Sequence, residues 1–386
     1  MNADLRRPAS AIRCDLLIVG AGPAGCAAAV AARRAAPRLA ITVVDAARFP
    51  REKLCGGAIT GGGLRELHLA GLELRVPQTS VGHALLRANG VSVRVELPRP
   101  AAVVRRAELD ADLVSQARAA GASVLEEAPL LELRGDLAVT GQGGIRFGAL
   151  IAADGVGSAS RRALGLPTGR RVPLRETRVA AAGQRDLLFD LDVDVPGYAW
   201  RFPCRGHGGD TETCGVYAVE QVKRLDDELE RFAEREGIAG PVVPGRSAIR
   251  LFEPGGPVGK GNALLAGEAL GVDALAGEGI RYALWSGRIA GRLAAQALAR
   301  GRAPSLRSYR ARLIGSRSGV VLGLGARLAR RLYGPDPRWR RIACDQRVAT
   351  AVAALVSGEW PVLPVLGLVA RLPAAVGGAE SVLRGR

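Results

Sequence analysis

Cys55 is the side chain of this sequence best placed to do chemistry. It follows Arg51 and Lys53 and precedes two glycines. The two cations would favour the thiolate form, and a positioned thiol can donate a proton to a carbanion-like carbon. Cysteine is also among the most buried residue types, so a thiol that only packs is the alternative. The sequence leaves both roles open at Cys55.

Two aromatic side chains could shape a substrate site. Tyr198 and Trp200 stand two residues apart in a stretch that reads as a strand, so they share one face of it. There they could line a channel for an apolar substrate, and we assign them to the catalytic set with Cys55. Ordinary sheet core is the alternative. The three histidines and six cysteines include no CxxC pair, so the sequence predicts no metal site.

A glycine-rich turn near the start of the chain has the pattern of a dinucleotide-binding site. Residues 15–19 predict a buried strand, an Ala-rich helix follows the turn, and a second strand ends at Asp45. Gly20 allows the tight turn, Gly22 lets backbone N–H groups approach a pyrophosphate, and Gly25 permits close helix–strand packing. Asp45 can accept the ribose hydroxyls, which favours FAD or NAD over NADP.

Three later motifs could belong to the same site, and each could instead have a purely structural role. Arg106 begins a predicted helix but could be a solvated arginine, and Asp154 could cap the helix that follows it. Residues 277–280 could present backbone N–H groups at a helix N-terminus or form a simple glycine-rich loop. The preceding Gly267-Glu268 pair favours the functional interpretation of that loop.

The elements that must position these residues form an interrupted α/β pattern. Strand–helix alternation typical of nucleotide binding is broken twice by β-rich inserts, and helices follow residue 305. The predicted fold is therefore a discontinuous Rossmann-type FAD-binding domain with an inserted β-sheet substrate domain and a C-terminal helical segment. We assign 1–75, 101–172 and 256–304 to the FAD-binding domain, 76–100 and 173–255 to the substrate domain, and 305–386 to the helical segment.

Together these motifs resemble the geranylgeranyl reductase family, FAD-dependent enzymes with the fold of the aromatic-hydroxylase flavoproteins. The resemblance spans about residues 14–300 and departs from the family at Glu268, where an aspartate is usual, and at Ala274, where a proline is frequent. The segment 271–277 is also one residue shorter than is common. The matching motifs are Gly20–Gly25 with Asp45, Arg51–Gly57, Asp154–Ser158, Gly267–Ala269, Gly277–Ile280 and, more loosely, the YxWxFP-like Tyr198–Pro203.

The resemblance implies roles for individual residues. Arg106 would reach the phosphate and ribityl region of FAD, and the 277–280 loop would place N–H groups beside the isoalloxazine, where negative charge develops on reduction. The cofactor-binding set is Gly20, Gly22, Pro23, Ala24, Gly25, Asp45, Lys53, Cys55, Gly56, Gly57, Arg106, Asp154, Gly155, Gly267, Glu268, Gly277, Glu278, Gly279 and Ile280.

The expected reaction is the reduction of a carbon–carbon double bond in an apolar, isoprenoid-like or natural-product substrate, with hydride from N5 of reduced flavin. A flavin monooxygenase or dehydrogenase of secondary metabolism is the alternative. Two further alternatives rank below it. One is a flavin halogenase, whose tryptophan-rich signature is absent, and the other is a non-catalytic flavin carrier at a membrane. No second βαβ unit is visible, so NAD(P)H would dock transiently or a ferredoxin would donate electrons.

The formal net charge of +17 is concentrated near the C-terminus, where 15 arginines after residue 300 face four acidic residues. Arginines around Trp339 would suit an anionic membrane surface or an acidic carrier protein, and a solvated helix face is the alternative. The basic excess alone predicts no nucleic-acid binding. Residues 1–13 lack an apolar leader, which predicts a cytoplasmic protein that could be peripheral to the membrane.

Overall fold

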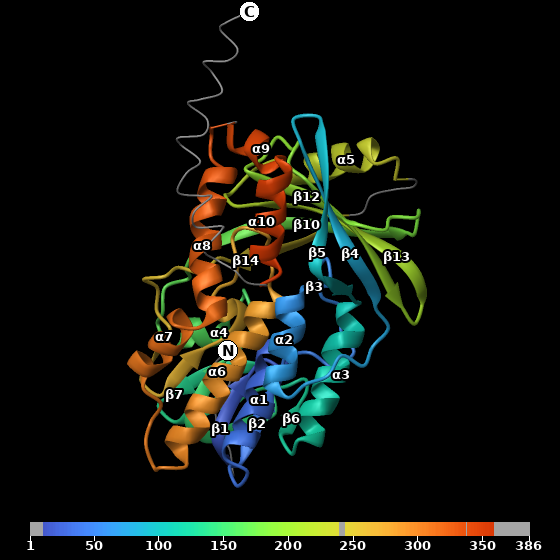
Figure 1. Cartoon of the computed structure of the whole chain (residues 1–386). Helices are drawn as coiled ribbons and strands as arrows, with labels where there is room; N and C mark the ends of the chain where they lie inside the picture. Colours follow the sequence, from blue (N-terminus) through green and yellow to red (C-terminus); the bar gives the residue numbers. More distant parts are fainter. Residues whose placement is uncertain (1–10, 239–243, 337, 359–386) are drawn as a thin grey trace, which may run out of the picture.

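Two sheets and the helices around them form the molecule. The computed structural model describes residues 11–238, 244–336 and 338–358. Sheet A, with helices α1 (Pro23–Ala35), α3 (Arg106–Ala119) and α6 (Ile280–Leu298), makes the lower part of the view in Figure 1, and sheet B with α5 (Leu225–Arg235) makes the upper part. Helices α8 (Arg317–Leu332), α9 (Arg338–Ala343) and α10 (Gln346–Val356) stand beside sheet B. The predicted fold class is confirmed, while the predicted domain bounds stay a prediction.

Sheet A has a parallel centre in the order β16-β9-β1-β2-β6. The strand β1 is buried along its second half, as expected for a parallel strand covered on both faces. Antiparallel strands extend the β9 side. The strands are β1 Ile12–Val19, β2 Ile41–Val44, β6 Ser123–Leu125, β7 Leu130–Arg134, β8 Leu137–Thr140, β9 Gly143–Ala152, β15 Gly259–Lys260 and β16 Ala263–Leu265.

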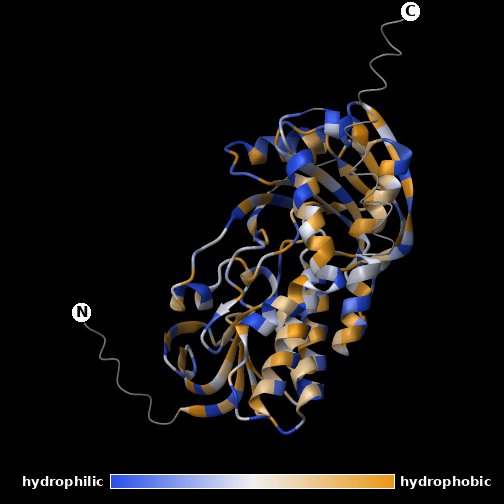
Figure 2. Cartoon of the chain, turned by 60° about the vertical axis from the view of Figure 1, so that its left-hand side comes forward, coloured by the Kyte–Doolittle hydropathy of each residue, from blue (hydrophilic) through white to orange (hydrophobic). Residues whose placement is uncertain are grey.

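Helices cover sheet A through small residues. Hydrophobic residues dominate its strands and the neighbouring helices (Figure 2). A Cβ on Gly287 or Gly291 of α6 would lie 2.1 Å from a backbone oxygen of α1, so only glycine permits this approach. The helices around this sheet are α1 Pro23–Ala35, α2 Gly61–Ala70, α3 Arg106–Ala119, α4 Ala159–Ala163 and α6 Ile280–Leu298, and η1 Gly267–Ala269 is a 3₁₀ turn.

Gly287→Ala is expected to destabilise the protein, although alanine is the better helix former. Its Cβ would lie 2.1 Å from the Ala24 carbonyl oxygen, and such overpacking costs about 1–3 kcal/mol. Gly323→Ala in α8 is the matched control, because nothing lies within 4 Å of its Cβ position. That control should gain up to about 1 kcal/mol. Urea unfolding of both variants checks the sign; equal changes would contradict the close packing.

Sheet B follows the order β14-β10-β13-β12-β11-β4-β5-β3 and is antiparallel except between β11 and β4. One of its faces looks into the molecule, and α5 (Leu225–Arg235) packs against β10 and β13. Its strands are β3 Ala58–Ile59, β4 Thr79–Ala88, β5 Val91–Val103, β10 Arg171–Ala180, β11 Leu187–Asp190, β12 Gly197–Gly206, β13 Gly209–Ala218 and β14 Gly245–Arg250.

Four helices end the described chain: α7 Leu306–Ile314, α8 Arg317–Leu332, α9 Arg338–Ala343 and α10 Gln346–Val356. The helix α10 packs against β5, and α9 contacts β4, so this segment joins the inner side of sheet B. Residues 359–386 of the predicted helical segment lie outside the described residues. Within the described ranges, no helix is long and apolar enough to cross a membrane.

Candidate active site

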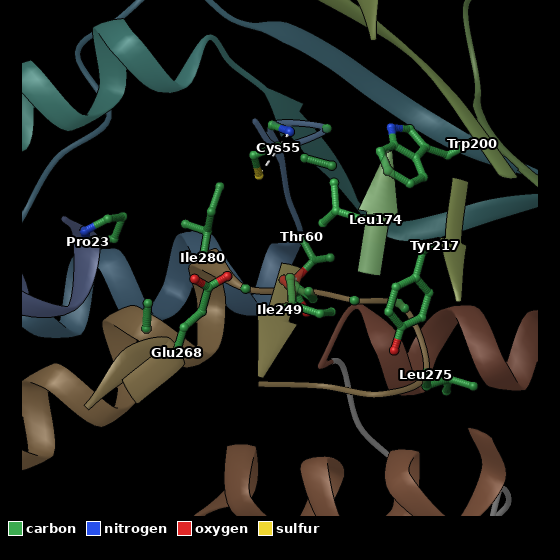
Figure 3. A pocket seen from close by; sticks show the side chains of 18 of the residues that line it. Pro23, Cys55, Thr60, Leu174, Trp200, Tyr217, Ile249, Glu268, Leu275 and Ile280 are labelled. Carbon is green, nitrogen blue, oxygen red and sulfur yellow. Dashed lines mark hydrogen bonds between the residues drawn. The ribbon is translucent and has the colours of Figure 1, made fainter. Parts of the chain in front are cut away.

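One cavity of about 730 Å³ collects the predicted site residues. It runs from the carboxyl ends of the sheet A strands to the inner face of sheet B. In Figure 3, Pro23, Ile280 and Glu268 lie toward one side, Trp200 and Tyr217 toward the other, and Cys55 between them. Every residue predicted to bind the cofactor or to act in catalysis lines this cavity except Gly25. Their individual roles stay predictions.

The turn after β1 forms the nucleotide end of the cavity. Gly20 has a φ of 103°, and its close approach to Ala153 leaves no room for a Cβ. Gly25 lies behind the turn, where a Cβ would lie 1.8 Å from the Gly20 carbonyl oxygen, so only glycine lets the helix start this close to the strand. Asp45 accepts the N–H groups of Ala21 and Ala47, at 2.7 and 2.8 Å, so both its oxygens are held at the cavity edge.

Asp154 serves a helix and the cavity at once. Its carboxylate accepts the Ser158 hydroxyl at 2.5 Å and the Ser160 N–H at 2.8 Å, which orders the start of α4. Gly155 follows with a φ of 73°, and a Cβ there would lie 3.7 Å from Glu268. Asp154 therefore supports the first turn of α4, although the N-cap residue is Ser158. Its role toward a cofactor stays a prediction, and its turn lies beside the Gly267-Glu268 turn.

A buried carboxylate holds two arginines at the cavity wall. Arg106 donates two hydrogen bonds to Asp110, at 2.9 and 2.8 Å, and Arg51 lies 3.2 Å from the same group. Burial alone would lower the pKa of Arg106, but the charges of Asp110 and Cys55 raise it above its usual value. Two cations against one carboxylate leave one positive charge here.

Both cations near Cys55 in the sequence form ion pairs with carboxylates on other elements. Arg51 pairs with Asp110, and Lys53 pairs with Glu268 at 3.4 Å. Arg106 also interacts with Cys55, and the effect of Arg51 and Lys53 on the thiol stays a prediction. The Cys55 sulfur also accepts the Gly57 N–H at 3.5 Å, the dashed line in Figure 3.

The 277–280 loop closes the cavity beside Cys55. Gly277 has a φ of 62°, and no side chain caps α6 at Gly279, so the first N–H groups of the helix stay available. Glu278 accepts the Thr60 hydroxyl at 2.6 Å and lies 3.7 Å from Arg281. Burial raises the pKa of Glu278 to about 7, although the Arg281 charge opposes the shift.

Aromatic hydroxyls fix the loop that leads into residues 277–280. Tyr198 donates to the Ala276 oxygen at 2.5 Å, Tyr217 to Ala274 at 3.2 Å and Tyr333 to Leu275. The Tyr198 ring packs 5.4 Å from Tyr217 and 6.1 Å from Trp200. Burial raises the pKa of Tyr198, so this hydroxyl keeps its proton in the bond to Ala276. Tyr198 therefore positions the loop.

The far end of the cavity is apolar. Sheet B forms one wall and α8, α9 and α10 form the other. Trp339 lines this wall under Arg331, and Arg340 donates to Leu191. The neighbouring Arg327, Arg330, Arg331, Arg338 and Arg341 are exposed, and contact of this region with a membrane or an acidic partner stays a prediction. The apolar lining comprises Leu86, Val95, Leu97, Phe189, Leu328, Leu332, Ile342, Val348, Val352 and Val356.

Sequence reasoning missed several residues of the site. Glu176, Thr60 and Tyr217 line the cavity, and Asp273 orders the loop by accepting the N–H groups of Leu275 and Ala276. Tyr217 could have been predicted, because an aromatic residue in a β-rich stretch is a candidate to line one face of the sheet. Glu176 could not, because a glutamate between arginine and threonine on a strand usually faces solvent.

The residues present fit a dinucleotide-sized ligand with phosphate and ribose groups. A Cβ on Gly22 would meet only the Arg51 guanidinium, at 3.7 Å, and one on Gly279 only Glu268, at 3.9 Å. The cavity therefore opens directly onto the backbone at both helix starts, and no side chain caps α1 or α6. Helix N-termini of this kind favour phosphate or other negative charge.

Comparison with known sequences identifies related reductases. The chain is 33% identical over 321 residues to a menaquinone reductase of Mycolicibacterium smegmatis, covering 73% of this chain and 76% of the relative. It is 28% identical to a digeranylgeranylglycerophospholipid reductase of Methanoculleus marisnigri, covering 93% and 94%. No protein-family model matches the chain.

Solved structures share the fold. A geranylgeranyl bacteriochlorophyll reductase-like protein of Thermoplasma acidophilum superposes with a TM-score of 0.77 and 19% identity, covering 90% of this chain and 96% of that one. A flavin-dependent brominase gives a TM-score of 0.68 at 16% identity, covering 90% and 94%. The sequence match to the mycobacterial enzyme, with the shared motifs and fold, shows that the chain belongs to the geranylgeranyl reductase family of flavin-dependent oxidoreductases.

Proposed function

We propose that the protein binds FAD and saturates a carbon–carbon double bond in the prenyl chain of an isoprenoid lipid, such as a menaquinone. The continuity of the cavity is the observation that carries this proposal. Glycine turns and Asp45 line one end, and apolar side chains from sheet B and α8–α10 line the other. A long apolar chain lying there would place one of its double bonds beside Cys55 and residues 277–280.

Each part of the site has a task in this proposal. The Gly20–Gly25 turn and the start of α1 would hold the pyrophosphate, Asp45 the ribose, and the Arg51–Arg106 pair the remaining negative charge. Bound FAD, once reduced, supplies the hydride. The apolar wall would exclude water from the reacting carbon, and Cys55 would deliver a proton to it. Names of the relatives support an isoprenoid substrate.

Anaerobic mixing with possible electron donors tests the proposal. The purified protein should release FAD on denaturation, and NADH, NADPH or reduced ferredoxin should bleach its flavin bands. The reduced flavin should then persist until an unsaturated prenyl lipid is added. Release of FMN would overturn the cofactor assignment. Reduced flavin that reacts only with oxygen would indicate a monooxygenase or halogenase, and flavin that reacts with neither would indicate a carrier.

A further inference from the structure

Glu176 is the only carboxylate in a row of side chains that crosses sheet B. The register aligns it with Gly215 of β13, which in turn pairs with Trp200 of β12. On the other side it aligns with Gly245 of β14. The row continues through Phe189 and Leu86, which also line the cavity. One acidic group therefore interrupts an apolar wall.

The two flanking glycines let large side chains cover Glu176. A Cβ on Gly215 would lie 2.2 Å from the Trp200 ring, and one on Gly245 would lie 2.7 Å from Leu54. Glu176 is accordingly only 3% exposed. The Glu176 carboxyl group therefore lies beneath the side chains of Trp200 and Leu54, where burial favours its neutral form.

The two oxygens of this carboxyl group have different surroundings. Oε1 accepts the backbone N–H of Cys55 at 3.0 Å. Oε2 is buried and has no hydrogen-bond partner among the described residues. An unpartnered buried carboxylate is costly, whereas a protonated carboxyl group is much less so.

The surrounding charges leave Glu176 able to change protonation near neutrality. Burial raises its pKa to about 7, against the Cys55 N–H and the positive charges of Arg178, Arg106 and Lys53. Cys204 of β12 and Cys214 of β13 also interact with it. Arg178, two residues along the strand, is one-third exposed, so solvent lies one position beyond Glu176.

We propose that Glu176 is a proton-relay residue that reprotonates Cys55 during the reduction. The Cys55 S–H bond breaks as a C–H bond forms on the substrate carbon, and Arg106 stabilises the thiolate. The Glu176 O–H bond then breaks, one water in the cavity passes the proton on, and the Cys55 S–H bond re-forms beside the N–H that Oε1 already accepts. Solvent on the Arg178 side returns a proton to the carboxylate. Only protons move in this relay; the two electrons arrive with the hydride. The inference rests on the proposed function, because a saturation needs this proton.

The first test measures the thiol without any substrate. Flavin-loaded wild type, Glu176→Gln and Glu176→Asp are treated with iodoacetamide across pH 6–9, and alkylation of the Cys55 peptide is followed by mass spectrometry. Above pH 7 the ionised Glu176 disfavours a thiolate beside it. Glu176→Gln, which can still accept the Cys55 N–H, should therefore alkylate faster at pH 8, by about tenfold.

The second test measures proton delivery with a fully unsaturated menaquinone as the probe. Glu176→Gln should slow side-chain saturation about 10²-fold, while Glu176→Asp should restore part of the rate. The wild-type rate should fall as pH rises through about 7, where Glu176 loses its proton. Simple distortion of the site by Glu176→Gln would not be expected to make the Cys55 thiol more reactive while slowing saturation. That combination of results therefore supports the relay.

Glu132→Gln is the matched control, because Glu132 lies on β7 outside the cavity lining and its side chain is 47% exposed. It should change neither measurement. Unchanged alkylation and saturation in Glu176→Gln would overturn the relay, as would a loss of both. If the wild type fails to saturate the probe, the proposed function fails for that lipid. The alkylation profile would still decide whether Glu176 controls the Cys55 thiolate.

Discussion

Cys55→Ala is expected to keep its flavin and to saturate substrate about 10²-fold more slowly. The side chain touches the cavity between the two ends of the site, and its sulfur lies in the hydrogen-bonding range of the Gly57 N–H and beside Arg106. Losing a general acid costs about this factor, whereas losing a packing contact costs about 1 kcal/mol of stability. Flavin reduction by the donor should be unaffected.

Stopped-flow reduction and single-turnover saturation separate the two steps. Cys344→Ala is the control, because Cys344 is also half-buried but lies outside the cavity lining. It should match the wild type in both steps. A Cys55→Ala variant that saturates substrate at the wild-type rate would show that the thiol only packs, and would remove the relay with it.

Asp110→Asn is expected to lower the free energy of unfolding by about 3 kcal/mol. Asp110 is fully buried and holds both Arg106 and Arg51. Its loss leaves Arg106, which is 6% exposed, without a counter-charge, and breaking a buried ion pair from one side costs about 3–5 kcal/mol. The partly exposed Arg51 can turn toward water, so we expect the lower end.

Denaturant unfolding of the flavin-free protein measures this change. Glu132→Gln removes a partner of Arg134 in a pair where both side chains are about half exposed. A surface pair of this kind contributes about 0–1 kcal/mol, so the control should stay near the wild type. Similar losses in both variants would contradict a buried anchor at Asp110.

Local patterns explain why much of the fold could be predicted. The Gly20–Gly25 turn depends on a φ value and on close contacts that only glycine allows. The positions of the glycines in the sequence are therefore enough to predict the turn and the strand before it. Asp45 was predictable because it ends a strand directly beside that turn. The resemblance supplied the later motifs, which the chain brings to the same cavity.

Long-range contacts explain what could not be predicted. Arg51 and Lys53 are near Cys55 in sequence, yet their side chains reach Asp110 and Glu268 on other elements. Trp339 lines the cavity because α9 packs against sheet B. Glu176 is buried because Gly215 and Gly245, on two other strands, leave room for Trp200 and Leu54 to cover it. The sequence of its own strand does not show which residues it pairs with.

Saturation of an isoprenoid chain under anaerobic single-turnover conditions is the most direct test of the proposed reaction. The protein is reduced, mixed with an unsaturated menaquinone, then quenched and exposed to air so that any reduced quinone head group reoxidises. We expect a lipid that retains two added hydrogens in its prenyl chain, formed in proportion to the flavin oxidised. The same measurement is repeated with a geranylgeranyl glycerolipid. If the flavin is oxidised but the prenyl chain keeps its mass with both lipids, the proposed reaction is contradicted.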